Sequence, residues 1–307
     1  MDYGHNIVTA ALRAGLLRAI LAWGRSPLEP HFIGAFDQIL NALFKSSLRT
    51  SIDELEAPIG GQTFQGFPTS DKWEALWSLL QRRWASMKAY IEREKASDRS
   101  ACSNITCATI ASKSVLRRCS GCRLCRYCSK ACQSDDWRNG HREMCGWTGG
   151  DDGGSVSRRD MSFLHALLHD DYLRMKRNIL NDELAYLRAN PGAPFYVNFD
   201  YWGLAMDGAC EVSVEPIDTF PLDNAMWRFQ DARARSSDGR VQLHVMRIAD
   251  GGCDSLFVFP LYSATAERSK GIEMLAADAT SAVDGREEAD SVQMQHLTEM
   301  DILEVHV

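Results

Sequence analysis

One short stretch of the 307-residue chain holds most of its cysteines and has the residue types to bind metal. Eight of the ten cysteines lie between Cys102 and Cys145, together with His141. In a reducing compartment such a cluster indicates metal ligands rather than disulfides. Structural zinc takes four nitrogen or sulfur donors, supplied as closely spaced pairs because one tight turn can aim two side chains at one ion. Seven cysteines and the histidine form four such pairs: Cys102 with Cys107, Cys119 with Cys122, Cys128 with Cys132, and His141 with Cys145.

Eight donors are enough for two closed four-ligand sites. We therefore expect two structural Zn²⁺ ions per chain. No coordination position remains for a water molecule, so the metal is not expected to catalyse a reaction. Spacing alone does not decide how the four pairs combine, since a sequential and a crossed pairing both fit the same string.

The stretch from Cys119 to Cys145 resembles the MYND zinc finger. Shared features are Tyr127 before the fifth ligand, Gln133 after the sixth, the pair Asp136-Trp137, and His141 four positions before the last cysteine. The resemblance covers roughly 45 of the 307 residues. It implies a crossed pairing, in which one zinc is held by Cys102, Cys107, Cys128 and Cys132, and the other by Cys119, Cys122, His141 and Cys145.

Two features depart from the family pattern. Four residues separate Cys102 from Cys107, where many members have two, and we interpret this as a tolerated loop variant. Cys125 lies three residues from both Cys122 and Cys128, so it has the spacing to form a competing pair. The family register leaves Cys125 outside both sets of ligands, as a spare thiol.

The resemblance also implies a ligand for the finger itself. MYND modules dock short proline-rich peptides in a shallow groove, and the matching contact residues here are Gln133 and Trp137. A proline-rich segment is already in the polyproline II form and loses little entropy on binding, while an exposed indole offers it a flat apolar surface. In the alternative reading Trp137 only packs against His141, and the finger is a structural clip between its neighbours.

Charge argues against direct nucleic-acid binding. The chain carries −7 overall, whereas phosphate binding needs concentrated Lys and Arg. Between Ala101 and Gly149 there are eight Lys or Arg and three Asp or Glu, a balance of +5 that leaves −12 for the rest. Seven thiolates and two Zn²⁺ reduce the balance of the finger to about +2, so its cations mainly stabilise a site built of thiolates.

The regions around the finger differ in composition and predict an α+β multidomain protein. Residues 1–99 carry apolar side chains at helical spacing and are expected to form a helical region. The finger occupies residues 100–148, and the Gly, Asp and Ser of residues 149–157 are typical of a flexible linker. Residues 158–270 are expected to be an α+β domain with a small antiparallel sheet. Residues 271–307 hold nine acidic residues and one basic residue, which predicts an acidic tail, part helical and part disordered.

Within the α+β region a helix is expected from Asp160 to Ala189, possibly with one break, because Asn190, Pro191 and Gly192 stop it. Alternation or apolar runs then predict three strands. A turn at Gly251-Gly252 would join the last two as a hairpin. The runs are Phe195 to Phe199, Val241 to Ile248, and Leu256 to Leu261.

Enzyme signatures are absent from the sequence. The Asn-His-Ser-Cys motif of SET methyltransferases, which accompany some MYND fingers, is missing, as are a phosphate-binding loop and a Gly-x-Ser-x-Gly elbow. His165 and His169 have a zinc-binding spacing, but the Glu of His-Glu-x-x-His proteases is absent and we expect solvated helix histidines. We therefore expect a non-enzymatic adaptor, of the kind that acts in transcriptional regulation or ubiquitin-ligase assembly. The alternative is an unidentified activity in the α+β region.

Residues Ile7 to Trp23 are rich in apolar side chains, but Arg13 and Arg18 interrupt them. A secretory signal needs a clean apolar centre, and a spanning helix needs about 20 apolar residues. The sequence therefore predicts no membrane association and a nuclear or cytoplasmic location.

Overall fold

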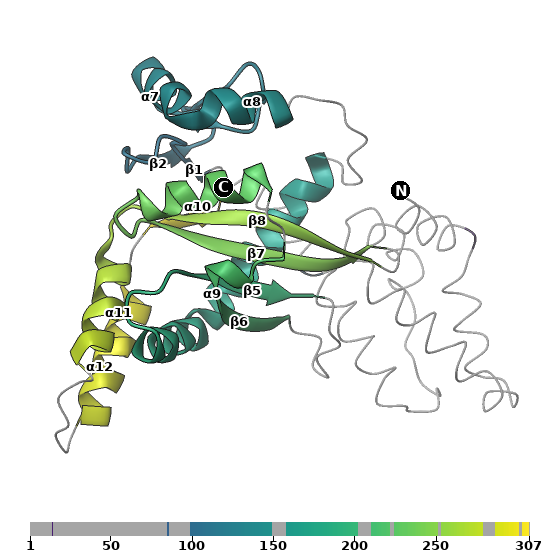
Figure 1. Cartoon of the computed structure of the whole chain (residues 1–307). Helices are drawn as coiled ribbons and strands as arrows, with labels where there is room; N and C mark the ends of the chain where they lie inside the picture. The colour runs from purple at the N-terminus through teal and green to yellow at the C-terminus, as the bar shows by residue number, and fades with distance from the viewer. Residues whose placement is uncertain are drawn as a thin grey trace, which may run out of the picture.

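A computed structural model describes residues 99–148, 158–201, 210–221, 224–250, 253–278, 286–300 and 303–306, with the isolated positions 14 and 85. The helices expected in residues 1–99 and the linker expected at residues 149–157 therefore lie outside the described ranges, apart from those two positions and residue 99. Helices and strands are mixed throughout the described part (Figure 1). None of the helices described is both long and apolar enough to cross a membrane.

A five-stranded sheet forms the centre of the fold, in the order β6-β5-β7-β8-β9. Its neighbouring strands pair antiparallel, as expected, except that β5 and β7 are parallel. β7 and β8 pair as far as Asp250 and Cys253, on either side of the expected turn at residues 251–252, which is itself outside the described ranges. The strands are β5 (Phe195–Asp200), β6 (Glu211–Pro216), β7 (Val241–Asp250), β8 (Cys253–Ser263) and β9 (Glu304–His306).

The parallel pair arises from a crossover helix that the sequence reading did not identify. After β6 the chain passes through a 3₁₀ turn (Ile217–Thr219) and helix α10 (Ala225–Arg235) before it enters β7. Asn224 caps α10 by accepting a hydrogen bond from the backbone N–H of Trp227 at 2.8 Å. β6 ends beside the start of β5, and the chain enters β7 at that same end of the sheet, so β7 runs in the same direction as β5.

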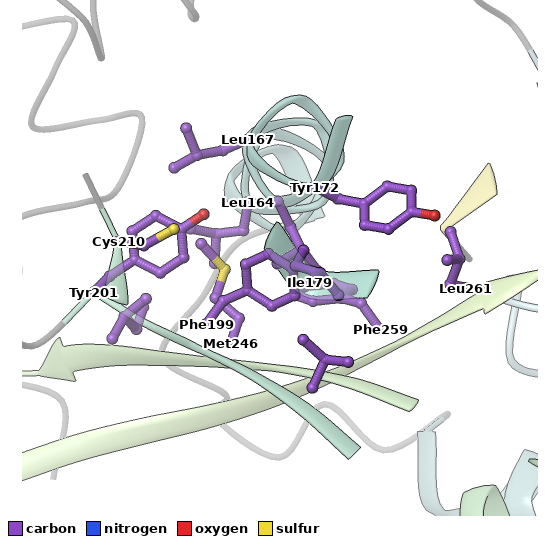
Figure 2. Close-up of a cluster of buried hydrophobic side chains, with 13 residues drawn as sticks. Leu164, Leu167, Tyr172, Ile179, Phe199, Tyr201, Cys210, Met246, Phe259 and Leu261 are labelled. Carbon is purple, nitrogen blue, oxygen red and sulfur yellow. The ribbon is translucent and has the colours of Figure 1, made fainter. Parts of the chain in front are cut away.

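Helix α9 (Arg158–Ala189) covers the opposite face of the sheet as one unbroken helix. Apolar residues at helical spacing, among them Leu164, Leu168 and Ile179, point from α9 onto the sheet and are fully buried. Figure 2 shows Leu164 and Ile179 in one cluster with Phe199 of β5 and Phe259 of β8. The alternate side chains of these strands point to the other face of the sheet, toward α10. There Tyr196, Leu243 and Val245 pack with Trp227.

The described residues of the acidic C-terminal segment, 271–278, 286–300 and 303–306, pack into this fold and do not form the separate tail expected at residues 271–307. Helix α11 (Glu267–Asp278) spans the expected boundary, and α12 (Arg286–Glu299) packs with it against α9 at one end of the sheet (Figure 1). Strand β9 then completes the sheet beside β8. An apolar stripe lies between the acidic residues of this segment, and a count of charges does not reveal it. The stripe consists of Ile272, Leu275, Met294 and Leu297, and all four are buried.

His165 and His169 are also placed differently from the expectation of solvated helix histidines. Both belong to a histidine cluster between α9 and the sheet, together with His244 of β7 and His306 of β9. His169 Nδ1 lies 3.0 Å from His306 Nδ1, and His306 Nε2 lies 2.8 Å from His244 Nδ1. The Nε2 atom of His165 is buried and has no hydrogen-bond partner among the described residues. They face inward because their positions on α9 continue the apolar stripe.

Candidate metal centre

The finger is a small module of short elements, and each aims a pair of ligands. It is joined to the rest of the fold beside α10 and β9 (Figure 1). Two hairpins pair β1 with β2 and β3 with β4, and a kinked helical segment follows. The elements are β1 (Arg99–Ala101), β2 (Ile110–Ser112), β3 (Arg117–Arg118), β4 (Arg126–Tyr127), α7 (Lys130–Asp136), a π turn (Trp137–His141) and α8 (Arg142–Thr148).

Local chemistry sets the spacing of the helical ligands. Ser129 caps α7 by accepting a hydrogen bond from the N–H of Cys132 at 3.1 Å, which places Cys128 and Cys132 one turn apart. Gly140 adopts φ +111°, a conformation that favours glycine, and the resulting kink turns the chain so that His141 and Cys145 face the same point. A side chain at Gly140 would also collide with the ring of Phe229 on α10.

The first cluster contains Cys102, Cys107, Cys128 and Cys132, whose sulfur atoms all lie within 4.8 Å of one another. Cys128 Sγ is 3.6 Å from Cys107 Sγ and 3.5 Å from Cys132 Sγ. A tetrahedral Zn²⁺ with Zn–S bonds of about 2.3 Å needs sulfur atoms roughly 3.8 Å apart. These separations fit the ion without rearrangement of the chain.

The second cluster contains Cys119, Cys122, His141 and Cys145, again within 4.8 Å. Cys119 Sγ is 3.7 Å from Cys145 Sγ, and His141 Nε2 lies 3.4 Å from Cys119 Sγ and 3.8 Å from Cys122 Sγ. Gly121 leaves room for this packing, since a Cβ there would lie 2.6 Å from Cys145 Sγ. The crossed grouping implied by the family resemblance is therefore the one that the folded chain assembles.

Cys125 belongs to neither cluster, but its side chain contacts a ligand of the second one. Its sulfur lies 3.4 Å from His141 Nδ1, on the side of the imidazole ring opposite the nitrogen that faces the cluster. Partners of this kind orient a histidine ligand and select its tautomer. The sequence reading left Cys125 as a spare thiol because nothing in its spacing reveals a contact to a residue 16 positions later.

Electrostatics in the metal-free cluster favours thiolate and imidazolium. A hydrogen bond from Cys125 is the largest cause that lowers the pKa of Cys122, to about 2. The hydrogen bond to Cys122 in turn raises the pKa of His141 to about 9. Zinc needs a neutral imidazole, so metal binding at this cluster must displace the His141 proton.

The finger is attached to the α+β domain by a buried ion pair. Arg233 of α10 donates to the Asp136 carboxylate at 2.6 Å, and the same guanidinium donates to the Ser103 carbonyl. Tyr127 donates to the second oxygen of Asp136 at 2.6 Å. The sequence reading took Asp136 only as a family feature and missed Arg233, which is 97 residues away and carries no local signal.

The two residues predicted to contact peptide lie on the first helix of the finger and its continuation. Trp137 is 40% exposed, and its ring meets the edge of His141 at a centroid distance of 5.6 Å. Gln133 is half-buried and lies one turn before Trp137. The indole thus both covers the second cluster and presents a face to solvent.

Comparison with known proteins agrees with this geometry. Residues 100–145 match the MYND finger family. The chain is 38% identical over 55 residues to ubiquitin carboxyl-terminal hydrolase 19 of Arabidopsis thaliana, an alignment that covers 18% of this chain and 8% of that protein. The search of solved structures finds no match. Residues 100–145 therefore form a MYND zinc finger, a protein-interaction module whose two ligand clusters fit two structural Zn²⁺ ions.

Proposed function

We propose that the protein is a non-enzymatic adaptor whose finger docks proline-rich segments of partner proteins, in the nucleus or the cytoplasm. The observation that carries the proposal is the exposure of Trp137 beside the second ligand cluster, where its ring packs against His141. An indole held by packing against His141 loses little freedom when a ligand stacks on it. Gln133, one turn earlier, supplies an amide that can bond the free carbonyls of a polyproline II segment.

The test is binding of the full-length, zinc-loaded chain to a panel of fluorescent proline-rich peptides. We expect affinity in the micromolar range, on the order of that for short pre-organised peptides, and a loss of tenfold or more in Trp137→Ala. Leu173→Ala is the matched control, because it removes an apolar side chain that is 53% exposed on α9. Metal content must stay at two zinc ions per chain in both variants. Equal binding by the wild type and Trp137→Ala, with zinc retained, would refute the docking role.

A second role, as a structural clip, is favoured by the attachment of the finger to α10. Arg233 and Asp136 are both buried, and Gly140 packs directly against Phe229. If the finger is only a clip, Trp137→Ala lowers the stability of the chain and no peptide binds. The search for activity would then move to the α+β domain. The proposed roles in transcriptional regulation or ubiquitin-ligase assembly depend on which partner the peptide panel identifies.

A further inference from the structure

The finger presents unpaired positive charge to solvent. Six of its eight Lys and Arg side chains are exposed, and none of these six forms an ion pair with any residue in the described ranges. They are Arg117, Arg118, Arg123, Lys130, Arg138 and Arg142.

The acidic residues of the finger do not balance this surface, because there are only three of them and one is buried. Asp136 is buried in the ion pair with Arg233. Asp135 accepts a hydrogen bond from Asn104 at 3.1 Å. Glu143 is exposed and Asp135 is half-buried, so the six exposed cations outnumber the acidic groups at the surface of the finger.

Part of this charge lies on the face that carries Trp137. Lys130, Gln133 and Trp137 follow one another at helical spacing from the start of α7, so they share one face of the helix, and Arg138 is the residue that follows Trp137 in the chain. The loop that carries Arg123 also lies near this face. Cys125 and Trp137 contact the same ring, that of His141, so this loop and the indole converge on one residue.

We propose that this face selects partner segments that carry Asp or Glu beside their proline-rich core. The inference rests on the docking function proposed above and names the charge of the ligand. Carboxylates next to the stacked core would meet Lys130 and Arg138, which form no ion pair with the residues that the structure describes. Such exposed pairs each add little affinity. They speed the encounter with acidic segments and disfavour positively charged ones.

An acidic peptide fits this surface better than a nucleic acid does. Outside the finger the chain is strongly acidic, and a polyanion many ångströms long would extend into that field. A short peptide with two or three carboxylates stays within a Debye length, about 10 Å at moderate salt, of the basic face. Stacking of successive bases also needs a row of exposed aromatic rings. Among the residues whose side-chain exposure the structure describes, Trp137 is the only exposed large aromatic one.

The experiment uses the full-length, zinc-loaded chain and three fluorescent peptides with one proline-rich core, flanked by Asp, Asn or Lys. We expect the Asp-flanked peptide to bind roughly three- to tenfold more tightly than the Asn-flanked one, the size expected for two exposed charge pairs. The Lys-flanked peptide should bind most weakly. The preference should disappear in high salt and in the double variant Lys130→Glu, Arg138→Glu.

Arg177→Glu is the matched control, since Arg177 is an exposed arginine on α9, and it should leave the preference unchanged. The charge reversal is compatible with the fold, because a Glu at the first position of α7 faces the positive end of the helix. If the double variant nevertheless loses zinc, the variant Lys130→Gln, Arg138→Gln replaces it. About half the effect on the preference is expected, because glutamine removes each positive charge whereas glutamate replaces it with a negative one.

Two outcomes would overturn the inference. Equal affinity for the Asp-flanked and Lys-flanked peptides, or a preference that survives the double variant, means that this face does not read charge. Tighter binding of a single-stranded oligonucleotide, lost in the double variant, would make the face a nucleic-acid surface instead. The Asn-flanked peptide separates this test from the proposed function, since its Trp137-dependent binding establishes docking without any charge effect. If none of the three peptides binds, both proposals fail.

Discussion

The buried histidine cluster should make the fold sensitive to mild acid. Burial is the largest cause that lowers the pKa of His165, to about 3, and it holds the pKa values of His244 and His306 well below their usual range. The unfolded chain exposes these rings, with pKa values of about 6.5. Between the two values the unfolded state binds more protons than the folded state. The free energy of unfolding is therefore highest above about pH 6.5, and it falls as the pH drops below that value.

The size of the effect follows from the number of buried rings. Each histidine that stays neutral in the fold costs about 1.4 kcal/mol per pH unit in this window. Three such histidines give a slope of about 4 kcal/mol per pH unit, against a total stability of roughly 5–15 kcal/mol for a domain. At that slope the whole stability is lost about one to four pH units below 6.5, where we expect cooperative unfolding.

The variant His165→Phe isolates one ring of the three. Its aromatic replacement retains the edge contact to Phe259, at a centroid distance of 5.4 Å in the wild type, and removes the unpartnered Nε2. Urea unfolding from pH 7.5 to 5, with zinc in excess, should give a slope lower than that of the wild type by about 1.4 kcal/mol per pH unit. Protonation of the zinc ligands affects both proteins alike and cancels in the difference.

The matched control is His296→Phe, on the exposed face of α12, which should leave the slope unchanged. Parallel plots of unfolding free energy against pH for the wild type and His165→Phe would refute the reasoning, because they would show that His165 takes up its proton equally in both states.

Three further predictions concern the finger. Cys132→Ser, or a strong chelator, should abolish hydrogen-exchange protection of the finger amides in the full chain, since structural zinc supplies on the order of 10–16 kcal/mol in small fingers. Arg233→Met should lower the unfolding free energy by about 3–5 kcal/mol, because it leaves the buried Asp136 carboxylate without its cation, whereas the exposed Arg235→Met should cost under about 1 kcal/mol in the same urea titration. Cys125→Ser should keep two zinc ions per chain by native mass spectrometry, and loss of one ion would place Cys125 among the ligands.

Local rules were enough to anticipate the elements that depend on neighbours in sequence. Helix α9 ends at Ala189 because Asn190, Pro191 and Gly192 follow, and Gly192 has φ +72°. The strands β5, β7 and β8 show in their apolar patterns. Strands β6 and β9 were not anticipated, because β9 is three residues long and follows an acidic segment. The parallel pairing of β5 with β7 depends on a crossover by α10 that no short window contains.

The metal-binding potential of the finger is already visible in its ligand spacing. Paired ligands lie close together along the chain because a single turn must present both of them, so their spacing is visible without the fold. The tertiary structure decided which pairs share an ion, that Cys125 contacts His141, and that Arg233 neutralises Asp136. It also decided that His165 and His169 face the interior. These contacts join residues far apart in sequence, and they form only when burial makes an unpaired charge or ring nitrogen costly.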